Sequence, residues 1–207
     1  MTSPSQTTHE KLLHEATALF ARRGYGGASM SEIAERVGVR KASLYNYYPS
    51  KADLLMDLLA RSLEAWEKAS RPVLEGPGSV EERLRAYLKM AIAFAEANPQ
   101  AIGIWRVAST QIGGELRQRV KDFLAEHERQ ARCQVVEFFE EAVENGELEP
   151  ADPQDLTLFL GTFLHGLLVS QIFATGEDHD FMGHLPELWK FFWRGISGRE
   201  PHTEFAQ

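Results

Sequence analysis

The chain contains a single cysteine, Cys133, among its 207 residues, so an internal disulfide framework is excluded. One free thiol fits a protein that works in a reducing compartment. The first eight residues are polar and lack the apolar run of a signal peptide. Together these features predict a cytoplasmic protein.

Sequence patterns of catalysis and metal binding are also missing. The chain has no glycine-rich phosphate loop, no HExxH motif and no nucleophile elbow. His9 and His14 are five residues apart and therefore do not share a helical face. We expect no enzyme activity, no metal site and no cofactor.

Charged residues are absent from one long stretch, residues 156–176, which is long enough to span a bilayer. Both flanks of this stretch are acidic, and no nearby lysine or arginine bias sets an orientation across a membrane. Polar residues also interrupt it, namely Thr157, Thr162, His165, Ser170 and Gln171. We interpret it as a buried helix of a soluble protein without membrane contact.

Alternating runs of β-branched residues are absent as well, so nothing predicts a β-sheet. Helical periodicity instead recurs from end to end, and glycine, proline and Asn-Gly clusters interrupt it. The first helix is expected over about residues 8–23, with Gly24 as its stop. The fold class is therefore expected to be all-α.

The net charge of −8 hides an uneven distribution. Residues 10–51 carry seven basic and four acidic side chains, or +3, and the chain after them carries 15 basic and 26 acidic ones, or −11. A basic head on an acidic body suits a protein that presents one end to DNA.

Two short helices separated by a tight turn follow the first helix. One begins at Ser29, where residues 29–32 have capping-box spacing, and stops at Gly38. The other covers about residues 41–48 and ends before Pro49. This is a helix-turn-helix pattern, in which the second helix enters the major groove.

Leu44 and Tyr48 are four residues apart, so they share a face and can pack on the preceding helix. The outward side then carries Lys41, Ala42, Tyr45 and Asn46. Tyrosine hydroxyls can hydrogen-bond to phosphates or bases, and asparagine can pair bidentately with adenine. A second interpretation stays open, in which Tyr45 and Tyr47 complete a small core and the basic residues are only solvated.

The order and spacing of these residues resemble a known family. Over about 45 positions, the chain looks like the N-terminal domain of TetR-family regulators, through Gly24-Tyr25, Ser29-Met30-Ser31-Glu32-Ile33-Ala34, Gly38-Val39, Leu44-Tyr45-Asn46-Tyr47-Tyr48, Ser50-Lys51 and Leu54-Leu55. The remaining body is similar only in helix count and length, in the manner of AcrR-like regulators.

The resemblance implies an all-α homodimer of about nine helices, with a three-helix helix-turn-helix head joined to a larger helical domain. Such proteins are usually transcriptional repressors that bind a palindromic, double-stranded operator, and a small-molecule effector releases them from it. The implied domains are a DNA-binding domain, residues 1–50, and a ligand-binding and dimerisation domain, residues 51–207. A ligand-independent DNA-binding protein that acts through protein partners is the alternative.

The resemblance also assigns DNA contacts, residue by residue. The matching positions are Ser29, Met30, Ser31, Arg40, Lys41, Ala42, Ser43, Tyr45, Asn46, Tyr47 and Lys51. Lys51 matches a phosphate-binding lysine at a helix start, where an anion is already favoured. Arg40 departs from the pattern, because relatives commonly have a capping Ser or Thr there. Whether Arg40 reads guanine or binds phosphate stays open.

The last two predicted helices are apolar enough to form a dimer interface. The last one has a single stripe of Leu185, Leu188, Trp189, Phe192, Trp193 and Ile196. The preceding one is apolar on two sides, with Phe159, Leu160, Phe163 and Leu167 on one and Leu158, Val169 and Ile172 on the other. A purely internal core is the alternative to a dimer contact.

An effector site is expected in the body, because pockets combine large apolar walls with a few convergent polar groups. The candidates are Tyr87, Met90, Phe94, Trp105, Arg106, Gln111, Phe123, His127, Phe163 and His165. Each of these aromatic side chains would serve equally well in an ordinary core, and a lone buried histidine is more often satisfied than ligand-binding.

Overall fold

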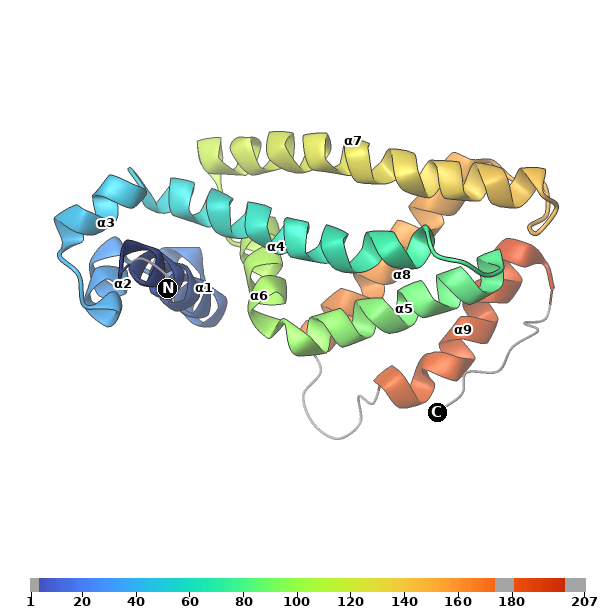
Figure 1. Ribbon diagram of the computed structural model, residues 1–207, viewed down its shortest axis with the longest axis horizontal. Coiled ribbons are helices and arrows are strands. Elements are labelled where there is room, and N and C mark those ends of the chain that lie inside the picture. Colours follow the sequence, from blue (N-terminus) through green and yellow to red (C-terminus); the bar gives the residue numbers. More distant parts are fainter. Residues whose placement is uncertain (1–3, 174–180, 200–207) are drawn as a thin grey trace. The chain divides into compact units, whose positions relative to one another are not determined.

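The computed structural model describes residues 4–173 and 181–199 (Figure 1). Within these ranges the chain forms helices and no strand, which confirms the predicted all-α fold. None of the described helices is both long and apolar enough to cross a bilayer. The helices are α1 Pro4–Gly27, α2 Met30–Val37, α3 Lys41–Tyr47, α4 Lys51–Leu74, α5 Val80–Ala97, α6 Pro99–Thr110, α7 Gly114–Glu144, α8 Pro153–Phe173 and α9 Phe181–Ser197.

The helices group into two compact units. Unit 1 comprises residues 1–65 and 98–125, and unit 2 comprises residues 66–97 and 126–207. The α4 and α7 helices each contribute residues to both units. The domain boundary that we expected between residues 50 and 51 separates a DNA-binding domain from a ligand-binding domain, whereas the two units are defined by contacts. The functional boundary therefore stays a prediction.

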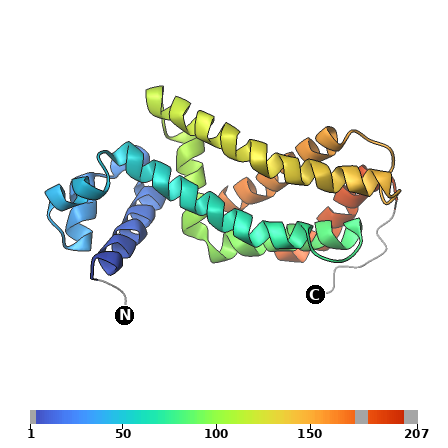
Figure 2. The same ribbon diagram turned by 45° about the horizontal axis from the view of Figure 1, so that its top comes forward.

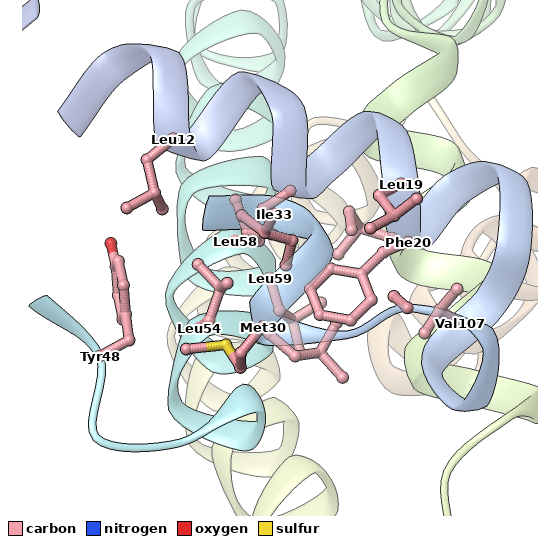
Figure 3. Packing of buried hydrophobic residues seen from close by; sticks show 14 of the residues in the cluster. Leu12, Leu19, Phe20, Met30, Ile33, Tyr48, Leu54, Leu58, Leu59 and Val107 are labelled. Carbon is pink, nitrogen blue, oxygen red and sulfur yellow. The ribbon is translucent and has the colours of Figure 1, made fainter. Parts of the chain in front are cut away.

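The core of unit 1 brings α1 to α4 together with α6 and the start of α7. Figure 2 shows α2 and α3 beside the beginning of α4. Apolar residues at helical spacing face inward, as the sequence pattern requires. Side chains with no exposed surface include Leu12, Leu19, Phe20, Ile33, Leu44, Leu54 and Val107 (Figure 3). Burying each leucine contributes roughly 2 kcal/mol, so this cluster holds the short α2 and α3 in place.

A close contact fixes α6 against α1. A Cβ atom added at Gly103 of α6 would lie 2.5 Å from the Cβ of Ala21 in α1. Beside it, Arg106 Nη2 donates a hydrogen bond to the Ala21 carbonyl at 2.7 Å. Only glycine at position 103 therefore allows this approach.

The predicted end of the first helix at Gly24 corresponds to a break rather than a stop. Gly24 has non-helical angles, φ 72° and ψ 178°, and α1 then continues to Gly27. The chain next enters α2 through Ser29, whose extended backbone and capping side chain begin a new helix.

The core of unit 2 is formed by α5, α8, α9 and parts of α4 and α7. A reciprocal capping box begins α5. The Glu82 N–H donates to Ser79 Oγ at 3.3 Å, and the Ser79 N–H donates to Glu82 Oε2 at 2.9 Å. The predicted apolar stripe of α9 is buried at Leu185, Trp189, Phe192, Trp193 and Ile196.

Candidate nucleic-acid interface

The start of α2 is ordered by its own side chains. Ser29 Oγ accepts a hydrogen bond from the Glu32 N–H at 3.1 Å, which is half of the expected capping box. The Glu32 carboxylate instead pairs with Arg23 at 2.9 Å and Arg36 at 3.1 Å. Ser29 and Ser31 are exposed, whereas the Met30 side chain is buried in the core. Met30 therefore offers only its backbone to a phosphate.

Gly38 makes the tight turn between α2 and α3. Its φ of 79° lies in the left-handed region, which costs glycine little because it has no Cβ. Its N–H closes the end of α2 on the carbonyls of Ala34 and Glu35, both at 3.0 Å. This turn brings α3 directly after α2, in a helix-turn-helix.

The α3 helix separates its core residues from its outward ones. Leu44 has no exposed surface and Tyr48 is 8% exposed, so both pack inside unit 1 as expected. Tyr45 and Tyr47 are 41% and 42% exposed, which contradicts the interpretation that they complete the core. Lys41, Ala42 and Asn46 are exposed as well, and Ser43 is half-buried.

Two large aromatic side chains on a seven-residue helix are costly to leave in water, so a partner surface is expected over them. Lys41 Nζ lies 5.8 Å from the centroid of the Tyr45 ring, which places a cation beside it. The outward face thus offers a positive charge, two phenol groups and one amide, which suit phosphates and base edges.

Arg40 occupies the N-cap position of α3 without capping it. Its side chain makes no cap hydrogen bond, in agreement with the expected loss of a Ser or Thr cap. Its carbonyl accepts from the Ser43 N–H at 2.9 Å and the Leu44 N–H at 3.3 Å, so the backbone alone begins the helix. Arg40 is exposed to solvent.

Lys51 has an internal role that the sequence did not indicate. Its Nζ donates to the carbonyls of Tyr25 at 2.7 Å and Ala28 at 3.0 Å. It also lies 4.2 Å from the centroid of the Tyr25 ring. Partial burial lowers the pKa of Lys51. Lys51 thus ties the α1–α2 connection to the start of α4, and its phosphate contact stays a prediction.

A polar network, which we did not predict from the sequence, connects the end of α3 to α1 and α4. Tyr48 Oη donates to Asp57 Oδ2 of α4 at 2.5 Å, and Arg61 Nε donates to the same carboxylate at 2.9 Å. His9 Nε2 of α1 lies 3.0 Å from Tyr48 Oη. Because the single phenol proton goes to Asp57, His9 acts as the donor here. The His9 ring also stacks on Tyr47, with centroids 5.4 Å apart.

The network keeps Tyr48 protonated. Burial raises the pKa of Tyr48, and the hydrogen bond to Asp57 raises it further. Asp57 and Arg61 are four residues apart on α4, and this spacing in the sequence already indicates that the two side chains form an ion pair. Their link to Tyr48 depends on tertiary packing, which spacing alone does not reveal.

The ten predicted effector residues are divided between the two units. Trp105, Arg106, Gln111 and Phe123 belong to unit 1. There Trp105 Nε1 donates to Ser62 Oγ at 2.8 Å, and Arg106 binds Ala21 as described above. The predicted set therefore does not converge within one unit.

The other six predicted effector residues lie in unit 2. Phe94 packs edge-on against Trp66 with centroids 5.3 Å apart, and Phe163 lies 4.9 Å from Phe192. Met90 is also packed against the core, and His127 is half-buried. Tyr87 and His165 of the predicted set line a cavity in this unit.

That cavity, the α8 groove, has a volume of about 470 Å³. Its lining contains an arginine and two threonines that the sequence reading did not select. The lining residues are Tyr87, Arg132, Val135, Thr157, Leu158, Leu160, Gly161, Thr162, Leu164 and His165. A groove of this size is within the range that holds small organic ligands.

Tyr87 connects the α8 groove to α4. It is 6% exposed, and its side chain forms hydrogen bonds with Trp66 and Ser70 of α4. Burial raises the pKa of Tyr87 to about 12, so the phenol is neutral near pH 7. The Trp66 ring packs edge-on against it, with centroids 6.1 Å apart. A change at Tyr87 therefore acts directly on α4.

Apolar side chains are exposed on α8 and α9. Leu158, Phe159 and Phe191 are 61%, 44% and 69% exposed. A Cβ added at Gly161 or Gly166 of α8 would meet nothing within 4 Å, so another helix could approach closely there. This uncovered surface favours a protein contact over a purely internal core. The side chains of Val169 and Ile172 lie outside the described residues.

The comparisons with known proteins agree with this geometry. The sequence family described as "Bacterial regulatory proteins, tetR family" matches residues 12–58, which cover most of α1, all of α2 and α3 and the start of α4. Two curated HTH-type transcriptional regulators match at 36% identity over 74 residues and 34% over 97, and the chain spans 38% and 44% of their lengths.

One curated relative covers more of the chain. The nucleoid occlusion factor SlmA of Vibrio vulnificus is 30% identical over 135 residues, which span 63% of this chain and 67% of that protein.

Solved structures share the fold over nearly the whole chain. FadR of Bacillus subtilis, solved in complex with stearoyl-CoA, has a TM-score of 0.76 at 16% identity and covers 91% of this chain and 99% of that one. AibR, solved in complex with isovaleryl coenzyme A and operator DNA, has a TM-score of 0.68 at 20% identity, with coverages of 89% and 97%. With its helix-turn-helix, its exposed α3 face and these relatives, the chain belongs to the TetR family of transcriptional regulators.

Proposed function

We propose that this chain is a homodimeric transcriptional repressor that binds a palindromic operator and is released by a small ligand bound in unit 2. The observation that carries this proposal is the division of α3. Leu44 and Tyr48 are buried, whereas Tyr45, Asn46 and Tyr47 are exposed, and Tyr47 is covered only in part by its stack on His9.

In this proposal α3 enters the major groove of each half-site. Asn46 and Tyr45 read base edges, and Lys41 and the start of α2 contact the phosphate backbone. In a two-fold dimer, the half-site centres lie roughly 34–36 Å apart, or a multiple of that distance. Arg40 stands beside this surface, and its contact is either a guanine or a phosphate.

The dimer forms through α8 and α9. Leu158, Phe159 and Phe191 supply an apolar surface that a second copy of the chain would bury. Two helices from each copy form a four-helix interface, and two-fold symmetry matches that of a palindrome. Phe191→Asp places a charge in this interface, so sedimentation should detect monomer. The exposed Lys68→Asp on α4 is the control that should leave the dimer intact.

Ligand release operates through α4 in this proposal. Tyr87 binds α4 at Trp66 and Ser70 within unit 2, and Tyr48 binds α4 at Asp57 within unit 1. The same helix thus contacts the floor of the α8 groove and the end of α3. A ligand releases DNA only if it binds the DNA-incompetent state more tightly than the competent one.

The proposal is tested by selecting bound sequences from random duplexes with the full chain, followed by fluorescence anisotropy on the selected site. We expect a palindrome, and Tyr45→Ala should weaken binding about tenfold without changing the sedimentation of the dimer. Tyr45→Phe removes the hydroxyl and keeps the ring, so it separates the contributions of these two groups to operator affinity. A selected pool without two-fold symmetry, or full affinity in Tyr45→Ala, would contradict the proposed mode of binding.

A second candidate function is a DNA-binding protein that acts through protein partners and needs no ligand. It is supported by the 30% identity to SlmA, which is described as a nucleoid occlusion factor and not as a transcriptional regulator. Both candidate functions use the same DNA-binding head. They differ in the α8 groove, which binds an effector in the repressor and has no such role in this candidate. Operator affinity that no groove ligand changes would favour it over the repressor.

A further inference from the structure

One permanent positive charge lies in the described lining of the α8 groove. Of the ten lining residues that the structure describes, none is Asp or Glu, and Arg132 of α7 carries the permanent charge. An arginine stays protonated at every pH that a cell reaches. At short range, this guanidinium group attracts an anion that enters the groove.

The groove also has an apolar floor and a polar rim. Leu160, Leu164 and Tyr87 are 2%, 7% and 6% exposed, so they lie deep in the structure. Thr162 and His165 are exposed, one turn apart on α8, and Arg132 is exposed on α7. A molecule that fills this space meets apolar groups below and hydrogen-bonding groups near the solvent.

Arg132 differs from two other arginines of α7 in its described partners. Arg129 pairs with Glu126 and Arg119 with Asp53, both at 2.9 Å. Among the side chains that the structure describes, no carboxylate forms a salt bridge with Arg132. A planar guanidinium group recognises carboxylate and phosphate oxygens in a bidentate manner.

We propose that the α8 groove binds a small amphipathic anion. The acidic head lies against Arg132 within the rim formed by Thr162 and His165, and the apolar chain covers Leu160 and Leu164. The proposal rests on the proposed function in taking this groove as the effector site, but its binding chemistry is tested separately. Carboxylate and phosphate heads share the required chemistry.

The test is isothermal titration of the full chain with three ligands of equal chain length, decanoate, decyl phosphate and decanol. We expect either anion to bind about tenfold more tightly than decanol, because one charge-assisted hydrogen bond accounts for a difference in affinity of about that size. Arg132→Gln should remove this preference and leave decanol binding unchanged. Arg129→Gln, on the same helix, should keep the preference. The ratio of the two anions identifies the preferred head group.

A second variant locates the site. Thr157→Trp places a ring in the groove from a lining residue outside the proposed dimer surface, so it should abolish binding of all three ligands while circular dichroism and sedimentation stay unchanged. Equal affinity for decanol and the anions, an unchanged preference in Arg132→Gln, or no binding of any ligand would overturn the proposal. Anion binding through Arg132 without release of the operator would uphold it and contradict the proposed function.

Discussion

Replacing Tyr48 by phenylalanine removes one oxygen atom and keeps the buried ring, so it isolates the polar network at the end of α3. The hydroxyl donates to Asp57 at 2.5 Å and lies 3.0 Å from His9 Nε2. A hydrogen bond to a charged group contributes about 1.5–3 kcal/mol. Asp57 keeps its Arg61 partner, and its side chain is 30% exposed, so water replaces part of the loss. We therefore expect Tyr48→Phe to cost about 1.5 kcal/mol, at the low end of that range.

Urea unfolding monitored by circular dichroism measures this cost, with Asp57→Asn and the double variant completing a mutant cycle. Because the two side chains touch, the cycle should give a coupling energy of about 1 kcal/mol. Arg61→Gln is the control, since it removes a pair on the exposed side of Asp57 and should cost only about 0.5 kcal/mol. Additive single effects, or a Tyr48→Phe variant as stable as the parent, would refute the network as an energetic link.

Three further predictions concern other parts of the molecule. Leu44→Ala should destabilise unit 1 by about 3 kcal/mol through a cavity, whereas Asn46→Ala should weaken operator binding with unchanged urea stability. Lys51→Ala should weaken binding to all duplexes about equally and lower the salt slope by about one. It should also reduce urea stability, because two carbonyls lose their donor. The pKa of Tyr87 is raised to about 12 from 10.0, so its stabilisation is complete below pH 10 and is lost between pH 10 and 12. Alkaline unfolding should therefore be less steep in Tyr87→Phe, and an identical profile would contradict this assignment.

The sequence predicted the head well because its signals are local. Ser29, Gly38 and Pro49 mark helix ends through short-range chemistry, and the spacing of Leu44 and Tyr48 determines which side of α3 is buried. The observed ends of α2 and α3 lie within a residue or two of the expected ones. The family resemblance added the roles of individual residues, which stay predictions until DNA binding is measured.

The effector residues stay a prediction, and the sequence could not show which of them converge, because convergence depends on contacts between distant helices. The reading selected large aromatic residues, but Phe94 and Phe163 pack into the core of unit 2 and Trp105 lies in unit 1. It omitted Arg132, one of four arginines in a long polar helix, which no local pattern distinguishes. The internal contacts of Lys51 were missed for the same reason, since its carbonyl partners lie 26 and 23 residues away.

The outward face of α3 has a consequence for how such a protein acquires new operators. Lys41, Ala42 and Asn46 are exposed and contribute little to the core of unit 1. Under the proposed mode of DNA binding, substitutions at these positions would change the set of readable bases at almost no cost in folding free energy. Tyr48, one residue beyond the face, has no such freedom, because Asp57 and His9 depend on its hydroxyl. Specificity can therefore diverge rapidly at a few positions while the scaffold around them stays constant.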